Sequence, residues 1–501
     1  MDVATAAQTP HPPTPAPIAR HRSAMRRGAL SRPLAAALAH GVVCPERSVF
    51  DFGCGRGDDV SRLRALGVQA DGWDPAFFPA EHRQAADVVN LGFVVNVIED
   101  RRERAAVLQD AWQLARSVLV VAARMVWEAK TLRGMSHGDG VVTGRGTFQK
   151  LFSQEELRSW IEQTLGTRPV AAAPGVFYVF RSSEDAQGFL ASRVRRRVAV
   201  PSIAASAELY DAYREELAPL VAFLADRGRL PRPEELPNAT EVASRFGSIR
   251  AAYTVICRAT SASQWDRIAA ERRKDTLVYL ALGAFGGRPS FSALPPELQL
   301  DVRDFFGSYK AAVAQADHLL FSAGNADAVE VACRASLVGK LTPDALYVHE
   351  SAAGDLPALL RVYEGCGRAL AGTVEGANVV KLTRRKPKVS YLSYPRFDQE
   401  PHPALAQSTV ASLDGLTLAV YDYRSSENPA ILHRKETLVG PEYPLRKRFA
   451  RLTAQEERLG LYGRPEAIGT VKGWAHALEK ANVEQRGHRV VRRVRDQAAE
   501  S

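Results

Sequence analysis

The chain has 501 residues and a formal net charge of +10, so several domains and a polyanionic partner are expected. Hydrophobic residues make up 46% and charged residues 24%, as in globular proteins, and no apolar run reaches the roughly 20 residues that span a bilayer. The five cysteines lack CxxC spacing, which argues against a zinc site or a disulfide framework and for reduced thiols in a cytoplasm.

In chain order, residues 1–17 are rich in Pro and Ala without the apolar core of a signal peptide, which predicts a disordered tail. Strand-like and helix-like segments then alternate over residues 18–185. The predicted strands are 49–52, 68–73, 86–91, 117–123 and 174–181. The predicted helices are 58–66, 101–115 and 154–165, the last opened by a capping box from Ser153 to Glu156. This alternation predicts an α/β fold with a doubly wound, Rossmann-like parallel sheet.

The composition changes after this segment. Residues 186–340 carry helical periodicity and predict a helical domain. Residues 341–485 mix one helix with strand-like runs and predict a mixed α/β C-terminal domain. A basic, polar tail is expected over 486–501.

A glycine-rich stretch, DFGCGRGDD, follows the first predicted strand, with Gly53, Gly55 and Gly57 at alternate positions. A strand, a Gly-rich turn and a helix N-terminus suit a nucleotide-like cofactor. Asp58 stands where the dinucleotide fingerprint has its third glycine, and Asp59 follows. Two carboxylates there would repel a pyrophosphate, which argues against NAD and FAD, and no Gly-Lys-Ser/Thr follows for a P-loop.

S-adenosylmethionine suits the same stretch because it carries no phosphate. Its sulfonium and α-ammonium are cationic and favour a nearby carboxylate such as Asp51. Asp74 ends the next predicted strand, 23 positions after Asp51, where an acidic residue takes ribose hydroxyls in nucleotide-binding sheets. We therefore expect S-adenosylmethionine as cofactor, bound by Asp51, Gly53, Gly55, Gly57, Asp74 and Asn90.

DFGCGRG resembles motif I of class I S-adenosylmethionine-dependent methyltransferases, and residues 86–108 resemble the fourth strand and following helix of that fold. More narrowly, the chain is similar to the DNA phosphorothioation-associated putative methyltransferases. The stretches that carry this resemblance include IARHRSAMRRGALSRP, GWDP, VVNLGFVVNVIED, VSYLSYPRFDQEPHP and NPAILHRKETLV. The resemblance implies a bacterial protein linked to systems that replace a DNA phosphate oxygen with sulfur, and it supplies no established substrate.

The chain departs from the wider superfamily in two places. Only 11 residues separate Asp74 from Ala86, so the usual third strand is missing or greatly shortened. Methyltransferases of adenine N6 or cytosine N4 carry [D/N]-P-P-[Y/F] after the fourth strand, where this chain has Asn90-Leu91-Gly92-Phe93. In one interpretation Asn90 points at the methyl acceptor and Phe93 stacks on a flipped base. In the other, Phe93 is a core residue and Asn90 caps the strand. The acceptor atom stays open, and Cys54 is interpreted as a packing residue.

Three basic clusters suit a nucleic acid, which the resemblance implies is DNA. Each cluster alone is typical of a solvated surface. The first, over residues 18–33, contains Arg20, Arg22, Arg26, Arg27 and Arg32 without any acid. The second contains Arg193, Arg195, Arg196 and Arg197. The third combines Lys381, Arg384, Arg385, Lys386 and Lys388 with Tyr391, Tyr394 and Phe397.

His433 is a candidate general base because imidazole titrates near neutrality; the other interpretation is a polar residue at an exposed strand end. His402, His433 and Asp398 lack the spacing of metal ligands, so no metal is expected. We expect a cytoplasmic enzyme that transfers a methyl group to DNA. The alternative is a non-catalytic protein that binds S-adenosylmethionine and DNA and supports or senses a modification system.

Overall fold

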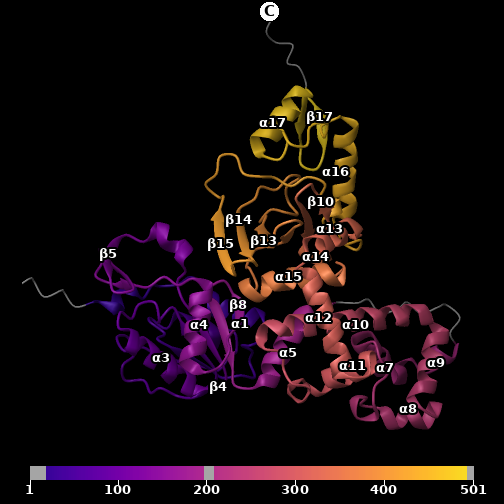
Figure 1. Ribbon diagram of the computed structural model, residues 1–501, viewed down its shortest axis with the longest axis horizontal. Coiled ribbons are helices and arrows are strands. Elements are labelled where there is room, and N and C mark those ends of the chain that lie inside the picture. Colours follow the sequence, from indigo (N-terminus) through magenta and orange to yellow (C-terminus); the bar gives the residue numbers. More distant parts are fainter. Residues whose placement is uncertain (1–17, 197–207, 494–501) are drawn as a thin grey trace, which may run out of the picture. The chain divides into compact units, whose positions relative to one another are not determined.

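The computed structural model describes residues 18–196 and 208–493. Contacts divide the chain into two compact units, Met1–Arg181 (unit 1) and Ser182–Ser501 (unit 2), whose elements are labelled in Figure 1. The predicted tail over 1–17 lies outside the described residues. Within the described part, no helix combines the length and the apolar character needed to cross a membrane.

Unit 1 is built on a six-stranded sheet in the order β2-β1-β3-β4-β9-β8. The strands are β1 (Val49–Phe52), β2 (Ala70–Trp73), β3 (Ala86–Gly92), β4 (Ala115–Ala122), β8 (Val170–Ala173) and β9 (Val176–Phe180). Strands β1 to β4 are parallel, whereas β9 is antiparallel to both β4 and β8. The parallel core confirms the predicted α/β fold.

Helices cover both faces of this sheet. They are α1 (Arg32–Ala39), α2 (Asp58–Ala65), α3 (Arg101–Leu114) and α4 (Gln154–Leu165). Leu108 of α3 and Ile161 of α4 share a core with Phe177 of β9. Side chains alternate between the faces of a strand, so Tyr178 lies on the opposite face, where its hydroxyl is 3.0 Å from His40 Nδ1 at the end of α1. The sheet is therefore doubly wound, as predicted.

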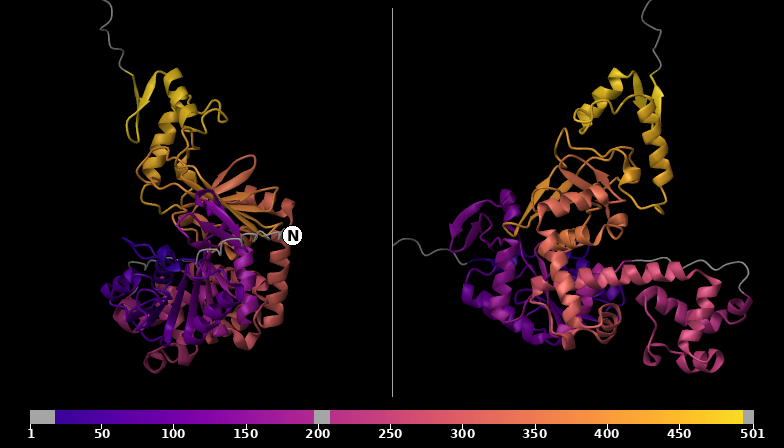
Figure 2. Two further views of the ribbon diagram at one scale, coloured as in Figure 1. Left: turned by 90° about the vertical axis from the view of Figure 1, so that its left-hand side faces the viewer. Right: turned by 45° about the vertical axis from the view of Figure 1, so that its right-hand side comes forward.

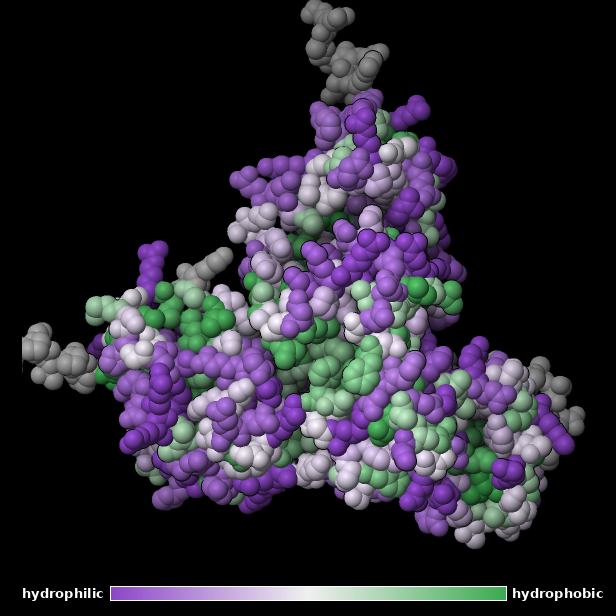
Figure 3. Space-filling model, viewed as in Figure 1, coloured by the Kyte–Doolittle hydropathy of each residue, from purple (hydrophilic) through white to green (hydrophobic). Residues whose placement is uncertain are grey.

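Unit 1 has two unusual features: one edge of its sheet lacks a strand, and a small sheet is inserted after β4. No strand forms between Asp74 and Ala86, and β2 is the edge strand, so the predicted loss of the usual third strand is confirmed. After β4, a 3₁₀ helix (η2, Val126–Thr131) and a small antiparallel sheet are inserted. Its strands are β5 (Gly134–His137), β6 (Gly140–Thr143) and β7 (Phe148–Gln149). Apolar side chains gather on the surface of this insertion (Figure 3), where Met135 is 76% exposed. Sequence patterning had not indicated it.

Unit 2 begins with helices and continues into an antiparallel sheet (Figure 2). The helices are α5 (Ser183–Val194), α6 (Glu208–Ala212), α7 (Arg214–Arg227), α8 (Ala239–Phe246), α9 (Ile249–Ala259), α10 (Ala262–Gly283), α11 (Pro296–Phe306), α12 (Tyr309–Ala323), α13 (Ala326–Ala335), α14 (Glu350–Ala353), α15 (Ala358–Ala371), α16 (Arg446–Arg458) and α17 (Val471–Lys480). The sheet runs in chain order through β10 (Lys340–Leu341), β11 (Ala345–His349), β12 (Val379–Thr383), β13 (Lys388–Ser393), β14 (Gln407–Ser412) and β15 (Thr417–Asp422).

The division predicted at residue 340 does not separate two cores. One core contains Val278 of α10 and Ala316 of α12 together with Leu382 of β12 and Tyr391 of β13. A helix must bury its apolar stripe against another layer, and here α10 and α12 share a core with the sheet. The tail predicted from residue 486 is also partly structured, because β17 (Val490–Arg492) pairs with β16 (Val483–Gln485). Residues 494–501 lie outside the described part.

Candidate functional site

The glycine loop joins β1 to α2 at the carboxyl edge of the unit 1 sheet. Gly53, Gly55 and Gly57 have φ of 81°, 55° and 75°, in the left-handed region that side chains disfavour. A Cβ on Gly53 would lie 2.5 Å from Val94 Cγ2, so only glycine fits there. The three glycines therefore set the path of the loop at the edge where open α/β sheets bind their ligands.

A buried polar pair lies beside this loop. Asp51 of β1 and Asn90 of β3 are 4% and 2% exposed. The two residues are in register, and Asn90 Nδ2 donates to Asp51 Oδ1 at 2.8 Å. Asn90 Oδ1 is buried and has no hydrogen-bond partner in the described structure. The pair thus presents a carboxylate and a vacant acceptor, an arrangement that suits a cationic N–H donor.

The environment of Asp51 disfavours its negative charge. Burial raises the pKa of Asp51 to about 7, and the carboxylates of Asp59 and Asp74 add to this rise. The Asn90 amide and the positive charge of Arg27 act in the opposite direction. A cationic ligand beside Asp51 would relieve this cost, because an opposite charge favours the ionised form.

Asp74 follows β2 directly, and β2 is parallel to β1, so Asp51 and Asp74 lie at the carboxyl ends of adjacent strands as predicted. Its Oδ2 accepts from Gly55 N at 3.0 Å, and its Oδ1 accepts from Ala76 N at 2.9 Å and Phe77 N at 3.1 Å. A carboxylate has about four lone-pair sites. Three backbone donors leave room at Oδ2 for one ligand hydroxyl.

Cys54 is a packing residue, as expected. A Cβ on Gly72 would lie 2.9 Å from Cys54 Cβ, so the thiol fills the space that this glycine leaves. Burial, together with the Asp51 and Asp74 carboxylates, raises the pKa of the thiol to about 12. The thiol therefore stays protonated at neutral pH, unlike a nucleophilic cysteine.

Residues 18–33, called the strap below, cross the carboxyl edge of the sheet. At one end Ala19 N donates to Gly146 O at 2.8 Å, in the turn between β6 and β7. In its middle, Ala24 Cβ lies 3.3 Å from the position that a Cβ on Gly55 would take. At the other end the strap continues into α1. It therefore lies against the glycine loop.

Two carboxylates at the start of α2 hold the strap. Asp58 Oδ2 accepts from Arg27 N at 2.7 Å, and Asp59 Oδ1 accepts from Ser31 N at 2.8 Å. Arg62, further along α2, donates to the Arg27 carbonyl at 2.6 Å. The acidic pair in DFGCGRGDD is therefore bonded to the backbone of the strap. Sequence reasoning missed this contact because the partners lie far upstream and carry no local signal.

Phe93 follows β3 at the same edge as Asn90. Its φ of 63° is unusual for a bulky side chain and marks local strain. The Arg27 and Arg32 guanidinium carbons lie 5.5 Å and 5.7 Å from its ring centre, within cation–π range. The ring is half-buried rather than part of the interior core. Asn90 and Phe93 thus lie at one edge, but the ring contacts the strap.

Not every arginine of the strap is available to a polyanion. Arg20 donates to Glu99 at 2.9 Å and to Glu103 at 2.6 Å, so two carboxylates, rather than a nucleic acid, neutralise its charge in this structure. Arg22 and Arg26 are exposed. The second predicted cluster is likewise occupied: Arg193 bonds to Thr373, Arg195 pairs with Asp226, and Arg196 pairs with Glu271 and Asp355. Arg197 lies outside the described residues.

The third cluster needs the largest correction. Tyr391 and Tyr394 are 2% and 3% exposed and belong to two hydrophobic cores of unit 2, so the predicted stacking of these rings on a base is wrong. Arg384 is also buried and donates to Glu330 at 2.6 Å. Strands β12 and β13 direct these side chains inward. Arg385 and Lys386, in the turn between the strands, are exposed.

His433 belongs to a buried aromatic cluster of unit 2, so its interpretation as an exposed strand-end residue is wrong. Its Nε2 donates to Ile468 O at 2.8 Å, and its ring lies 4.4 Å from that of His402 and 4.7 Å from that of Trp474. Burial, with the neighbouring His402, lowers the pKa of His433 to about 3. A base of that pKa does not titrate near neutrality, which also overturns the predicted general-base role. Among the described residues no group of His, Cys, Asp or Glu could hold a metal ion.

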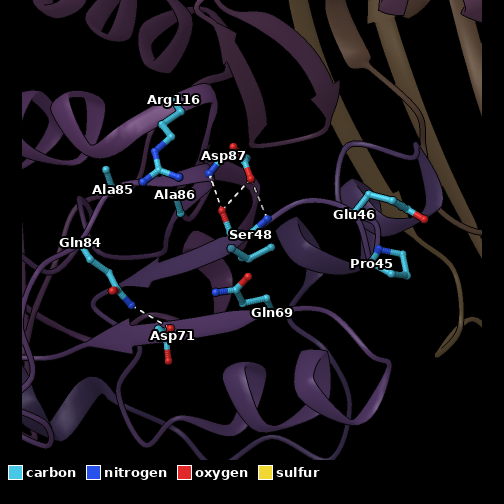
Figure 4. Close-up of a pocket in the computed structure, with 11 residues that line it drawn as sticks. Pro45, Glu46, Ser48, Gln69, Asp71, Gln84, Ala85, Ala86, Asp87 and Arg116 are labelled. Carbon is cyan, nitrogen blue, oxygen red and sulfur yellow. Dashed lines mark hydrogen bonds between the residues drawn. The ribbon is translucent and has the colours of Figure 1, made fainter.

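A polar hollow of about 310 Å³ lies at the opposite, amino edge of the unit 1 sheet (Figure 4). Ser48 N and Oγ donate to Asp87 Oδ2 at 2.9 Å and 2.7 Å, and Gln84 donates to Asp71 at 2.8 Å. None of the residues predicted to bind a cofactor lines this hollow. The candidate site is therefore the carboxyl edge beneath the strap.

No protein-family model matches the chain, and no curated protein matches it. Among solved structures, about a third of the chain is similar to Burkholderia thailandensis 1,6-didemethyltoxoflavin-N1-methyltransferase with bound 1,6-didemethyltoxoflavin and S-adenosylhomocysteine. The identity is 15%, over 32% of this chain and 78% of that chain, with a TM-score of 0.22. A sugar N-methyltransferase from Streptoalloteichus has 13% identity over 36% and 99% of the two chains, with a TM-score of 0.23.

Magnesium protoporphyrin IX methyltransferase from Synechocystis, with bound S-adenosylhomocysteine, has 14% identity over 32% of this chain and 93% of that chain, with a TM-score of 0.23. Because these TM-scores are low, the fold assignment depends on the strand order and directions of unit 1. That parallel, Rossmann-like core with one reversed strand is the architecture of class I methyltransferases.

The raised pKa of Asp51 predicts a stability effect of Asp51→Asn. Between pH 4 and pH 7 the unfolded chain has lost this proton while the folded chain keeps it, so this group's contribution to stability falls as pH rises and is lost above pH 7. An asparagine at this position cannot ionise, so the variant does not lose this stability as the pH rises. We expect Asp51→Asn to gain about 3 kcal/mol relative to wild type between pH 4.5 and pH 8. Calorimetric unfolding at both pH values measures this, with Asp71→Asn as control; a difference independent of pH would contradict it.

Proposed function

We propose that unit 1 binds S-adenosylmethionine at the carboxyl edge of β1, β2 and β3 and that the protein transfers its methyl group. The observation that carries this proposal is the buried Asp51–Asn90 pair beside three left-handed glycines. These acceptor groups fit the ligand. An ammonium N–H of the ligand would donate to the vacant Asn90 Oδ1, and its positive charge would lower the cost of ionising the buried Asp51 carboxylate. Asp74 Oδ2 would accept from one ribose hydroxyl.

The bound cofactor would supply an electrophilic methyl group on a sulfonium. The residues of this chain would then bind and orient the cofactor. Asp51 and Asn90 would hold its amino group, the glycine loop would contact its methionine part, and Asp74 would bind its ribose. Phe93 borders the position of the methyl acceptor. Direct displacement needs an in-line arrangement more than covalent help from the protein, so positioning is the main contribution.

We propose DNA as the methyl acceptor, in connection with phosphorothioate modification and the proteins that perform it. The net charge of +10, the exposed Arg22 and Arg26 of the strap, and the exposed Arg385 and Lys386 of unit 2 support a polyanionic acceptor. The link to phosphorothioation comes from the sequence resemblance. Because the proposed acceptor is DNA, we also propose that the protein acts in the cytoplasm.

The second candidate is a non-catalytic protein that binds S-adenosylmethionine and DNA and senses or supports the modification system. Two observations favour it: the sheet lacks its usual third strand, and the strap contacts the Phe93 ring that an acceptor base would need. Both candidates bind the cofactor, so turnover separates them.

Asp74→Ala tests the cofactor site. Removing the carboxylate deletes its bond to the ribose and loosens the Gly55 backbone, so we expect the Kd for S-adenosylmethionine to rise by a factor equivalent to about 1–3 kcal/mol. Isothermal titration calorimetry measures it. Asp71→Ala is the matched control, an acidic residue of the same strand at the amino edge, and should bind as wild type. No binding by the wild-type protein would refute the proposal.

Transfer of label from methyl-tritiated S-adenosylmethionine to DNA tests turnover. We expect label in phosphorothioated or plain DNA after incubation with the full chain, and none with Asp51→Asn, which lacks the charge that the cofactor needs. Cofactor and DNA binding without any transfer of label would favour the non-catalytic candidate.

Replacing Arg385 and Lys386 by Gln tests the phosphate contact in unit 2. We expect weaker DNA binding and a log–log salt slope that is flatter by about 1–2 units, because each phosphate contact contributes about 0.9. Fluorescence anisotropy across a salt series measures the slope. Arg384 is left intact because it is buried and paired, and an unchanged slope in the double variant would assign these cations to a solvated surface.

A further inference from the structure

We propose that unit 2 carries a binding surface for the phosphate backbone of double-stranded DNA, where helix α16 meets the β16–β17 hairpin (Figure 1). This C-terminal basic surface consists of Lys447, Arg448 and Arg451 of α16 together with Arg489 and Arg492 of the hairpin. It lies outside the three basic clusters that the sequence indicated. It would bind DNA whether or not unit 1 transfers a methyl group, so the inference goes beyond the proposed function.

Side-chain contacts fix the hairpin alongside the helix. Gln455 of α16 donates to Val490 O at 2.6 Å and accepts from Val490 N at 3.0 Å. Nearer the start of the helix, the Phe449 ring stacks on the His488 ring, with centroids 5.9 Å apart. The two contacts follow the same order along both elements, so β17 runs beside α16. Arg489 lies between them in the hairpin.

Helical spacing places cations on the side of α16 that is next to the hairpin. Arg448, Arg451 and Gln455 follow one another at three- and four-residue spacing, so they form one row along the helix. Gln455 bonds to β17, so this row borders the hairpin. On β17, Arg492 lies on the same strand face as Val490, which packs against α16 in a shared core. Cations of two elements therefore converge on one surface.

The protein supplies no counter-charge to this surface. All five cations are exposed, and within the described part of the chain none of their side chains forms an ion pair or a hydrogen bond. The acids of α16 and of the hairpin are already paired: Glu456 with His402, Glu457 with Arg434, and Glu484 with Arg486. The C-terminal basic surface thus differs from the clusters around Arg20 and Arg196, whose charges are neutralised by carboxylates.

The placement of these cations is unfavourable for the isolated helix. The first turn of α16 contains Arg446, Lys447 and Arg448 and no acid. A helix N-terminus carries a partial positive charge that favours acids there, and like charges at four-residue spacing, such as Lys447 and Arg451, repel each other. A polyanion on this surface would offset both effects. Local arrangements that cost stability in this way are expected at functional sites.

The surface fits a duplex backbone better than a single strand or a membrane. The planar guanidinium fork of arginine matches phosphate oxygens. Single-strand sites add aromatic rings on which bases stack, but the exposed side chains that the structure describes in α16 and the hairpin include no aromatic ring. The apolar face of α16 is buried, with Phe449 1% exposed, so the helix presents no such face to a lipid surface.

Fluorescence anisotropy of a labelled DNA duplex with the full chain, across a salt series, tests this surface. Replacing Arg448, Arg451 and Arg489 by Gln should flatten the log–log salt slope by about 2–3 units and raise the Kd by about tenfold or more at low salt, because each phosphate contact contributes about 0.9 to the slope. The matched control makes the same change of charge at three exposed arginines of α9 and α10: Arg250, Arg258 and Arg267. Its Kd should stay within about twofold of wild type.

A second variant separates charge from structure. Lys at the same three positions keeps the positive charge, so the wild-type slope should return; a Lys variant with the slope of the Gln variant would overturn the proposal. Equal weakening by the Gln variant and its control, or an unchanged slope, would overturn it as well.

Two further probes test the kind of partner. Tighter binding of the matching single strand than of the duplex, or binding of phosphatidylserine vesicles that the Gln variant abolishes while duplex binding persists, would overturn the assignment to duplex DNA. None of these measurements uses a cofactor. Absence of methyl transfer by the wild-type protein would therefore overturn the proposed function and leave this surface standing.

Discussion

The hydrogen bond from Asn90 to Asp51 joins two parallel strands at a place where a carboxylate is costly. An ionisable group this deeply buried without an opposite charge destabilises the fold. The surrounding elements reduce that cost in part, through the Asn90 amide and the nearby charge of Arg27, and they leave Asn90 Oδ1 without a partner. The fold therefore offsets the cost of burying this carboxylate only in part.

The strap is the second element that depends on this edge. It lies against the glycine loop at Ala24 and against the Phe93 ring, so one segment contacts the ends of both β1 and β3. Asp58 and Asp59 hold its backbone, which gives the acidic residues after the glycines a structural reason. The acidic residues after the glycines thus bind a segment that lies far upstream in the sequence.

In unit 2, the basic and aromatic segment over residues 381–397 contains both buried and exposed side chains. Tyr391, Tyr394 and Arg384 stabilise the cores around β12 and β13, while Arg385 and Lys386 project from the turn. The side chains of a strand alternate between faces, and both faces of these strands are covered. Cations and aromatics close together in sequence therefore do not form one binding surface. In this segment Arg385 and Lys386 are exposed, whereas Lys381 and Lys388 are half-buried.

The sequence by itself determined the parallel sheet, the glycine loop and the position of Asp74, because strand periodicity, left-handed glycines and a capping box act over a few residues. It also determined the absence of the third strand, since 11 residues are too few for a strand and a returning helix. Only the tertiary structure decided which charges are free. Arg20 meets Glu99 across 79 residues and Arg384 meets Glu330 across 54, and no local pattern specifies such pairs. It likewise decided that His433 is buried and that the strap covers Phe93, because burial and long-range contacts exist only once the chain has folded.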